Sequence, residues 1–78
     1  MDWQAVVGAN VKALRQAKGL TQEKLAFAAD LDLTYIGGIE RGRRNPSLLV
    51  MVRLAEALGA DLADLIDQNA GKQAVEPR

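Results

Sequence analysis

Pairs of helix-ending and helix-starting residues recur along this chain, and they constrain its fold more than any other feature of the sequence. Glycines that can end a helix in the left-handed conformation stand at Gly19, Gly42 and Gly59. Side chains that can cap a helix N-terminus stand at Asp2, Thr21, Asp32, Ser47 and Asp61. Because the segments between these signals are short and lack strand-like alternation, the sequence predicts an all-α domain of five short helices.

The apolar residues between these signals follow a helical period. Val7, Val11 and Leu14 recur at i, i+4 and i+7, which predicts an amphipathic first helix from about Asp2 to Gly19. The other helices are expected from Thr21 to about residue 29, from Leu33 to about Glu40, from Leu48 to Leu58, and from Leu62 to about Asp67.

The fourth predicted helix has more apolar residues than one core-facing stripe can use. The inward stripe is predicted to be Leu48, Met51, Val52 and Ala55. Leu49 and Val50 are then left over. Their exposure is either incidental, as for many single apolar residues, or part of a protein interface. The candidate interface residues near the fifth helix are Leu62, Leu65 and Ile66.

Composition excludes several classes of function. The chain contains no cysteine and no histidine, and Ser47 is its single serine. Without cysteine, disulfide scaffolds, Cys-ligated zinc and thiol nucleophiles are excluded, and without histidine the commonest metal ligand is missing and Ser47 lacks the usual base of a serine triad. We therefore expect no enzymatic activity, no metal site, no cofactor and no small-molecule ligand. No apolar run is long enough to span a membrane, and the start of the chain does not resemble a signal peptide, so a cytoplasmic location is predicted.

Charge is neutral in total but uneven in distribution. The formal net charge is zero, which by itself argues mildly against nucleic-acid binding. Basic residues nevertheless predominate towards the front of the chain and acidic ones towards its end, and three arginines gather at Arg41, Arg43 and Arg44. These arginines either form one positive face or lie in an ordinary solvated loop.

The second and third predicted helices have the spacing of a helix-turn-helix. They occupy about residues 21–41 and are joined by a turn of three or four residues. In DNA-binding proteins with this arrangement, the second helix of the pair enters the major groove. The same spacing also occurs in bundles that bind nothing. We expect one folded domain over residues 1–67 and a frayed or disordered tail over residues 68–78.

The residues themselves favour the DNA-binding alternative. The segments VKALR (11–15), KGLTQEKLA (18–26), YIGGIERG (35–42) and RNPSL (44–48) resemble the Cro and phage-repressor family of helix-turn-helix proteins. The segments LAEALG (54–59) and LADLI (62–66) fit the same pattern. Within this family, the segments LDLTYI (31–36) and GIER (38–41) look most like the small controller proteins of restriction–modification systems. The resemblance covers about residues 5–67.

The resemblance implies a compact five-helix bundle of the phage-repressor type that binds double-stranded DNA as a homodimeric transcriptional regulator. It also implies recognition helices separated by about 34–36 Å, one turn of DNA. The expected DNA-contacting residues are Thr21, Gln22, Leu33, Thr34, Tyr35, Gly37, Gly38, Arg41, Arg43, Arg44 and Asn45. An alternative of another class is an antitoxin-like module that mainly binds a protein and only secondarily DNA. The short segment after the fifth helix disfavours that alternative.

Local chemistry supports several of these DNA contacts. Gln22 follows an N-cap, where free backbone N–H groups and a side-chain amide favour a phosphate. Arg43, Arg44 and Asn45 follow the recognition helix, where cationic side chains can hold the DNA backbone.

The recognition helix itself is poor in side chains that read bases. Thr34 is its one clear polar candidate, and Leu33 can offer only apolar contact, for example to a thymine methyl group. Gly37 and Gly38 either allow close approach to DNA or mark a helix of low sequence specificity.

Glu40 is expected to have a structural role. Its neighbours Ile36 and Ile39 face inward, so its carboxylate should be partly buried. The family resemblance suggests Arg15 of the first helix as its ion-pair partner.

Overall fold

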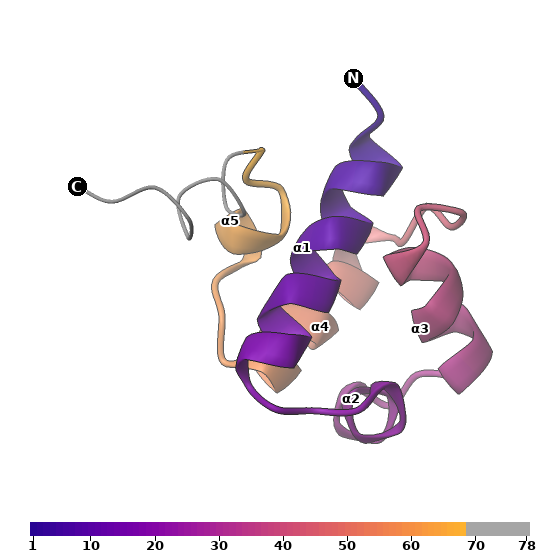
Figure 1. Cartoon of the computed structure of the whole chain (residues 1–78), viewed down its shortest axis with the longest axis vertical. Helices are drawn as coiled ribbons and strands as arrows, with labels where there is room; N and C mark the ends of the chain where they lie inside the picture. Colours follow the sequence, from indigo (N-terminus) through magenta and orange to yellow (C-terminus); the bar gives the residue numbers. More distant parts are fainter. Residues whose placement is uncertain (69–78) are drawn as a thin grey trace.

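Five helices form where the sequence places capping residues. In the computed structural model, which describes residues 1–68, they are α1 (Trp3–Ala17), α2 (Gln22–Ala29), α3 (Leu33–Glu40), α4 (Leu48–Leu58) and α5 (Leu62–Leu65) (Figure 1). The described residues contain no strand, so the predicted all-α class is confirmed. Most of the predicted tail, residues 69–78, lies outside the described residues. Within residues 1–68, no helix is both long and apolar enough to cross a membrane.

Side-chain caps begin the helices as predicted. A side-chain oxygen of the capping residue accepts a hydrogen bond from a backbone N–H two or three residues later at Asp2, Thr21, Asp32 and Ser47, over 2.8–3.2 Å. At α5 the carboxylate of Asp64 instead accepts from the backbone N–H of Asp61 at 3.0 Å.

The first four helices all end with a left-handed residue. Gly19, Gly42 and Gly59 have φ of 72°, 73° and 64°, as their type predicts. After α2 this position is held by Asp30, with φ of 57°. Asp tolerates the left-handed region better than most residues, and the backbone N–H of the next residue, Leu31, donates to the carbonyl of Ala26 at 2.9 Å. The turn between α2 and α3 is therefore a closed helix end rather than a loose linker.

Helix α5 is shorter than predicted, and Asn10 explains its end. The expected helix runs to about Asp67, whereas the observed one ends at Leu65. The side-chain amide of Asn10, which is 6% exposed, donates to the carbonyls of Leu65 and Asp67 at 2.9 Å each. These bonds satisfy the carbonyls that a buried helix end would otherwise leave unpaired.

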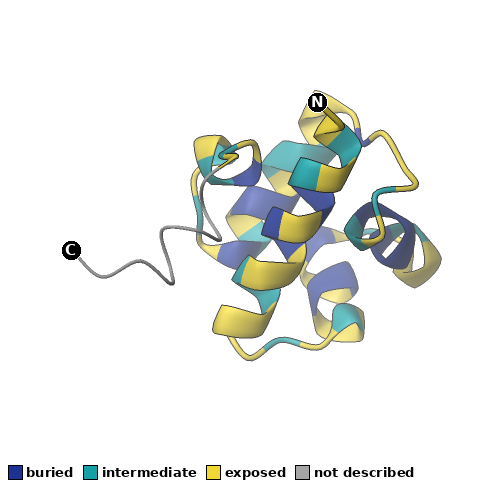
Figure 2. Ribbon diagram, turned by 45° about the horizontal axis from the view of Figure 1, so that its top comes forward, coloured by how far each residue is buried: buried dark blue, intermediate teal, exposed yellow. Residues whose placement is uncertain are grey.

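Helix α1 lies at the centre of the fold, with α4 packed behind it and α3 and α5 on opposite sides (Figure 1). All five helices contribute buried residues to the core, and Figure 2 shows where these residues lie along the ribbon. The fully buried members of this core are Val11, Leu25, Ile36, Ile39, Leu54 and Leu65.

The crossing of α1 and α3 depends on Gly8. A Cβ atom at residue 8 would collide with the carbonyl oxygen of Ile39 and lie 3.0 Å from that of Glu40. The missing side chain therefore lets the two helix backbones pack in contact. The stability gained from this close packing outweighs the low helix propensity of glycine.

Helix α4 is rotated relative to the prediction. Leu48, assigned to the inward stripe, is 60% exposed, and Val52 is only half-buried. Val50, assigned to the surplus, packs against the core. The reason is that the buried face is centred on Leu54 and Leu58, which places Leu49 on the outer side.

Candidate nucleic-acid interface

The frame of the helix-turn-helix is fixed by a buried ion pair. The Arg15 guanidinium of α1 donates from Nε to Glu40 Oε2 at 2.6 Å and from Nη2 to Glu40 Oε1 at 3.1 Å. Their side chains are 11% and 3% exposed, respectively. The Arg15–Glu40 pair suggested by the family resemblance is thus present, and it joins the last turn of α1 to the end of α3.

Two further hydrogen bonds extend this pair into a network across three helices. Arg15 Nη1 donates to the carbonyl of Leu20 at 2.8 Å, in the connection between α1 and α2. The amide of Gln22 donates to Glu40 Oε1 at 3.0 Å from the first residue of α2. Because every partner is hydrogen-bonded, the network holds α1, α2 and α3 in one relative orientation.

The same hydrogen bonds favour the charged form of Arg15. Hydrogen bonding to Glu40 raises the pKa of the Arg15 guanidinium above its ordinary value, against the opposing effect of burial. A raised pKa contributes stability that is lost only when the pH rises through the folded-state value. The shift adds to the strong tendency of any arginine to stay protonated, so Arg15 is charged throughout the neutral range.

Gln22 has a structural partner that the sequence did not indicate. One of its amide N–H bonds is used by Glu40, so its side chain is held half-buried at the start of α2. An amide nitrogen carries two N–H groups, which leaves one for a ligand. The predicted phosphate contact is thus compatible with the network.

The outer face of α3 carries the residues predicted to read DNA. Leu33 is 43% exposed and Thr34 is exposed in the first turn, whereas Tyr35 is half-buried. Ile36 and Ile39 point into the core and are fully buried. The first turn of α3 is consequently the part of the helix most open to a partner.

The two glycines of α3 are covered by arginines of the same chain. A Cβ at Gly37 would lie 3.1 Å from Nη1 of Arg41, and one at Gly38 would lie 2.8 Å from Cγ of Arg44. Both glycines are buried in consequence. In this conformation, arginine side chains occupy the space through which DNA would approach the helix backbone at these glycines.

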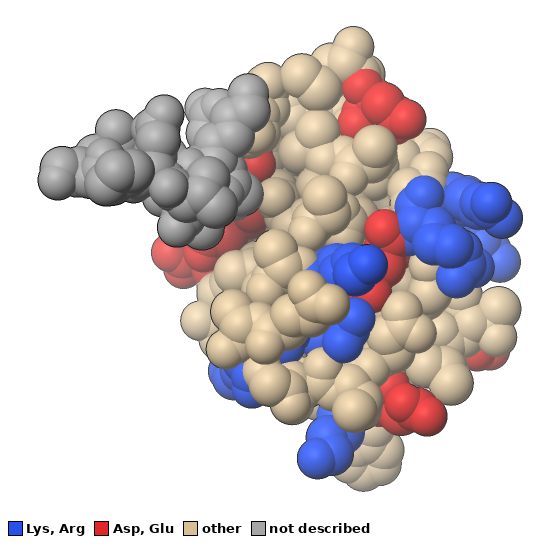
Figure 3. All heavy atoms as spheres, in the orientation of Figure 1, with Lys and Arg blue, Asp and Glu red and all other residues tan. Residues whose placement is uncertain are grey.

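The arginines that follow α3 are exposed and lie on an ordered backbone. Arg41, Arg43 and Arg44 are all exposed. The backbone N–H of Arg43 donates to the carbonyl of Gly38 at 2.9 Å, which closes the end of α3. Figure 3 shows a cluster of Lys and Arg side chains over this end of α3 and the following loop, with other basic and acidic side chains spread over the rest of this face. A chain of zero net charge thus presents a basic region at the end of α3.

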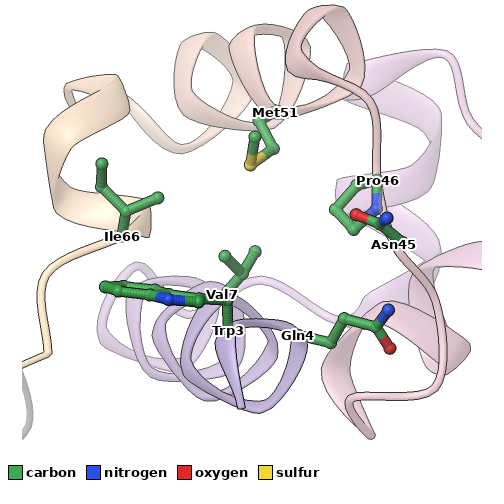
Figure 4. A pocket seen from close by; sticks show the side chains of 7 residues that line it. All are labelled: Trp3, Gln4, Val7, Asn45, Pro46, Met51 and Ile66. Atoms are coloured by element: carbon green, nitrogen blue, oxygen red, sulfur yellow. The ribbon is translucent and has the colours of Figure 1, made fainter. Parts of the chain in front are cut away.

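Asn45 directly follows Arg44 and borders a groove. With Gln4, Pro46 and Met51 it lines an apolar groove of about 390 Å³ between α1, α4 and the end of α5. Figure 4 shows the amides of Gln4 and Asn45 at one end of the groove, and Trp3 and Ile66 at the other. Of the predicted DNA-contacting residues, Asn45 is the one that the structure places beside this groove.

The predicted dimer residues differ in how far they are exposed. Leu49 is 74% exposed and Ile66 is 46% exposed, and Leu62 is half-buried. Leu65 is fully buried in the core of its own chain, so its assignment to a surface patch is wrong. Val50 packs against the core and is only partly accessible. Leu48, exposed beside Leu49, was missed because its helical phase was misjudged.

Three other residues that matter here were missed by the sequence analysis. Gly8 has a readable signal, since a glycine inside a helix and away from its end indicates close backbone approach. Asn10 stands on an apolar helix face, which is typical of a buried hydrogen-bonding residue. Phe27 is 90% exposed on α2, and nothing in its surroundings explains that exposure.

The sequence and the fold are similar to those of known regulators. A model of the helix-turn-helix family matches residues 11–65. The chain is 48% identical over 61 residues to the control protein C.BamHI of Bacillus amyloliquefaciens, covering 77% of this chain and 75% of that protein. It is 41% identical over 66 residues to an uncharacterised helix-turn-helix transcriptional regulator of Sinorhizobium fredii, covering 85% and 86% of the two chains.

Solved structures show the same likeness. The restriction-modification controller protein C.AhdI from Aeromonas hydrophila matches with a TM-score of 0.77 and 47% sequence identity. The match covers 80% of this chain and 94% of that one.

Proposed function

Because the chain belongs to the helix-turn-helix family, whose model matches residues 11–65, we propose that it binds double-stranded DNA as a transcriptional regulator, with α3 in the major groove. The observation that carries this proposal is the exposed first turn of α3, held by a buried network and flanked by exposed arginines. A rigid reading helix beside cationic side chains is what groove binding requires. The proposal assigns no catalysis to the chain and places it in the cytoplasm.

The proposed contacts divide by chemistry. Thr34 and Leu33, in the exposed turn, meet base edges or the adjacent sugar and phosphate. Thr21 and the remaining N–H of Gln22 face a phosphate at the start of α2. The exposed arginines after α3 bind phosphates on the other side of the reading helix. Base reading by so few side chains implies a substantial share of shape readout.

We further propose that two copies bind together. One short helix contacts too few bases for useful specificity, and paired recognition helices about 34–36 Å apart match one turn of DNA. The residues that we assign to a two-fold contact are the accessible apolar ones of α4 and of the α5 region, which are Leu48, Leu49, Leu62 and Ile66, with Val50 partly accessible. Leu65 is fully buried in its own chain and is not assigned to this contact.

Salt-dependent DNA binding tests the first proposal. The double variant Arg43→Ala/Arg44→Ala should weaken binding to the DNA upstream of the protein's own gene and to an unrelated duplex alike. It should also lower the slope of log K against log salt by about one unit per lost phosphate contact. Arg53→Ala is the matched control, because Arg53 is an exposed arginine on α4. An unchanged slope in the double variant would contradict the proposed contacts.

Sedimentation tests the second proposal. The wild-type chain should sediment as a dimer at tens of micromolar, and Leu49→Asp/Ile66→Asp should sediment as a monomer. Phe27→Asp is the control, since it places the same charge at an exposed apolar residue outside the patch. A dimer that survives the double substitution would place the interface elsewhere.

A further inference from the structure

Arg44 does not extend freely into solvent as an exposed arginine usually does. Its stem lies over Gly38, where a Cβ atom would be 2.8 Å from Arg44 Cγ and 3.4 Å from Nε. Its guanidinium carbon lies 5.4 Å from the centre of the Tyr35 ring, within the range of a cation–π contact. Residues 35 and 38 are three apart on α3, so both surfaces belong to one face of that helix.

We propose that Gly38 and Tyr35 form a seat for Arg44, and that Gly38 is a positioning residue which holds the Arg44 guanidinium in place before DNA arrives. The proposal rests on the DNA-binding function above. An arginine loses much of its rotamer freedom when it grips a phosphate. A side chain already held against the helix has lost part of that freedom before DNA arrives. The conformational entropy that it loses when it binds a phosphate is therefore smaller, which favours DNA binding.

A glycine is required for this seat. An alanine at residue 38 would bring a carbon within 2.8 Å of the Arg44 stem, closer than real side chains approach one another. The contact lies near the base of the stem, so the whole side chain must move away from the Tyr35 ring. Glycine is unfavourable inside a helix, and the space it leaves for Arg44 explains its presence at this position.

The neighbouring residues provide matched controls. A Cβ at Gly37 would meet Nη1 of Arg41 at 3.1 Å, which is the far end of a flexible side chain and can shift easily. Arg43 is equally exposed, and within the described part of the chain its side chain has neither a ring contact nor an ion pair. Arg44 is thus seated, whereas Arg43 is not.

Binding of a fixed DNA duplex tests the seat through a double-mutant cycle. Gly38→Ala should weaken binding about two- to fivefold, the effect of an exposed cation–π contact converted to an affinity ratio. In an Arg44→Ala background the same substitution should have no further effect, because the side chain it displaces is gone. Gly37→Ala should not couple to Arg44→Ala. Equal weakening by Gly38→Ala in both backgrounds, or none in either, would overturn the proposal.

A measurement without DNA separates the seat from the proposed function. Tyr35 is the single tyrosine of the chain, so its ring signals in an NMR spectrum are assigned without ambiguity. Arg44→Ala and Gly38→Ala should both shift these signals in the same direction, and Arg43→Ala should leave them in place. Unmoved signals in Arg44→Ala would overturn the seat. If the two variants shift these signals but the wild-type chain binds no DNA, the seat is upheld. The proposed function and the positioning role of Gly38 are then contradicted.

Discussion

Two groups of arginines in this molecule have opposite environments. Arg15 is buried between α1 and α3, where Glu40 and the carbonyl of Leu20 accept its hydrogen bonds. The arginines after α3 are exposed, and Arg43 has no ion-pair partner among residues 1–68. The first arginine therefore stabilises the frame, while the second group remains available to an external anion.

This difference shows that pairing and burial, rather than residue type, assign the role of a charge. A guanidinium enclosed by the fold, with each of its three nitrogens hydrogen-bonded to the protein, is not placed to bind an external phosphate. An exposed one contributes little to folding stability because water solvates it well. The same comparison applies to Gln22, whose amide belongs partly to the frame and partly to the surface.

The largest effect is expected from breaking the buried network. Glu40→Ala should lower the free energy of unfolding by about 3–5 kcal/mol, because it strands the buried Arg15 charge. Urea denaturation measures this loss, and Glu56→Ala, at an exposed carboxylate on α4, is the control. The double variant Arg15→Ala/Glu40→Ala should lose less than the sum of the two single variants. If Glu40→Ala unfolds like the wild type, Arg15 does not stabilise the frame, and the distinction between Arg15 and the exposed arginines after α3 is contradicted.

A somewhat smaller effect is expected at the helix crossing that supports the network. Gly8→Ala should destabilise the fold by about 1–3 kcal/mol through collision with the backbone of α3, although alanine is the better helix former. Thermal unfolding followed by circular dichroism measures it. Ala9→Ser, at the next and exposed position, should change stability little. Increased stability in Gly8→Ala would show that the two helices can separate without cost.

The reading face should respond in specificity rather than in stability. Leu33→Arg places a bidentate donor in the exposed first turn of α3 and should shift the preferred DNA sequence towards guanine, with discrimination of about 1–3 kcal/mol. Selection of binding sites from a random duplex library measures the preference. An unchanged preferred sequence would indicate that this face does not read bases.

The smallest effect is expected from the exposed arginines on folding. Arg43→Ala/Arg44→Ala should lower the free energy of unfolding by no more than about 1 kcal/mol, most of it from the lost contact between Arg44 and the Tyr35 ring. This is the counterpart of the Glu40 experiment, measured in the same urea titration. A loss comparable to that of Glu40→Ala would place these arginines in the frame and contradict the comparison.

The sequence by itself determined the number of helices and most of their ends. Caps such as Thr21 and Ser47, and left-handed glycines such as Gly19 and Gly59, act through hydrogen bonds within a few residues. Local chemistry of this kind can be read without knowing the rest of the fold. The order of motifs then indicated the helix-turn-helix and, through family resemblance, the Arg15–Glu40 pair.

Only the tertiary structure decided which apolar and which charged side chains are accessible. The burial of Leu65, the exposure of Leu48 and the anchoring of α5 by Asn10 depend on the relative placement of helices far apart in the sequence. The covering of Gly37 and Gly38 by arginines depends on how the chain turns after α3. Helical periodicity gives the direction of a side chain to within about a third of a turn. The packing of neighbouring helices determines whether that direction leads to core, to solvent or to another side chain.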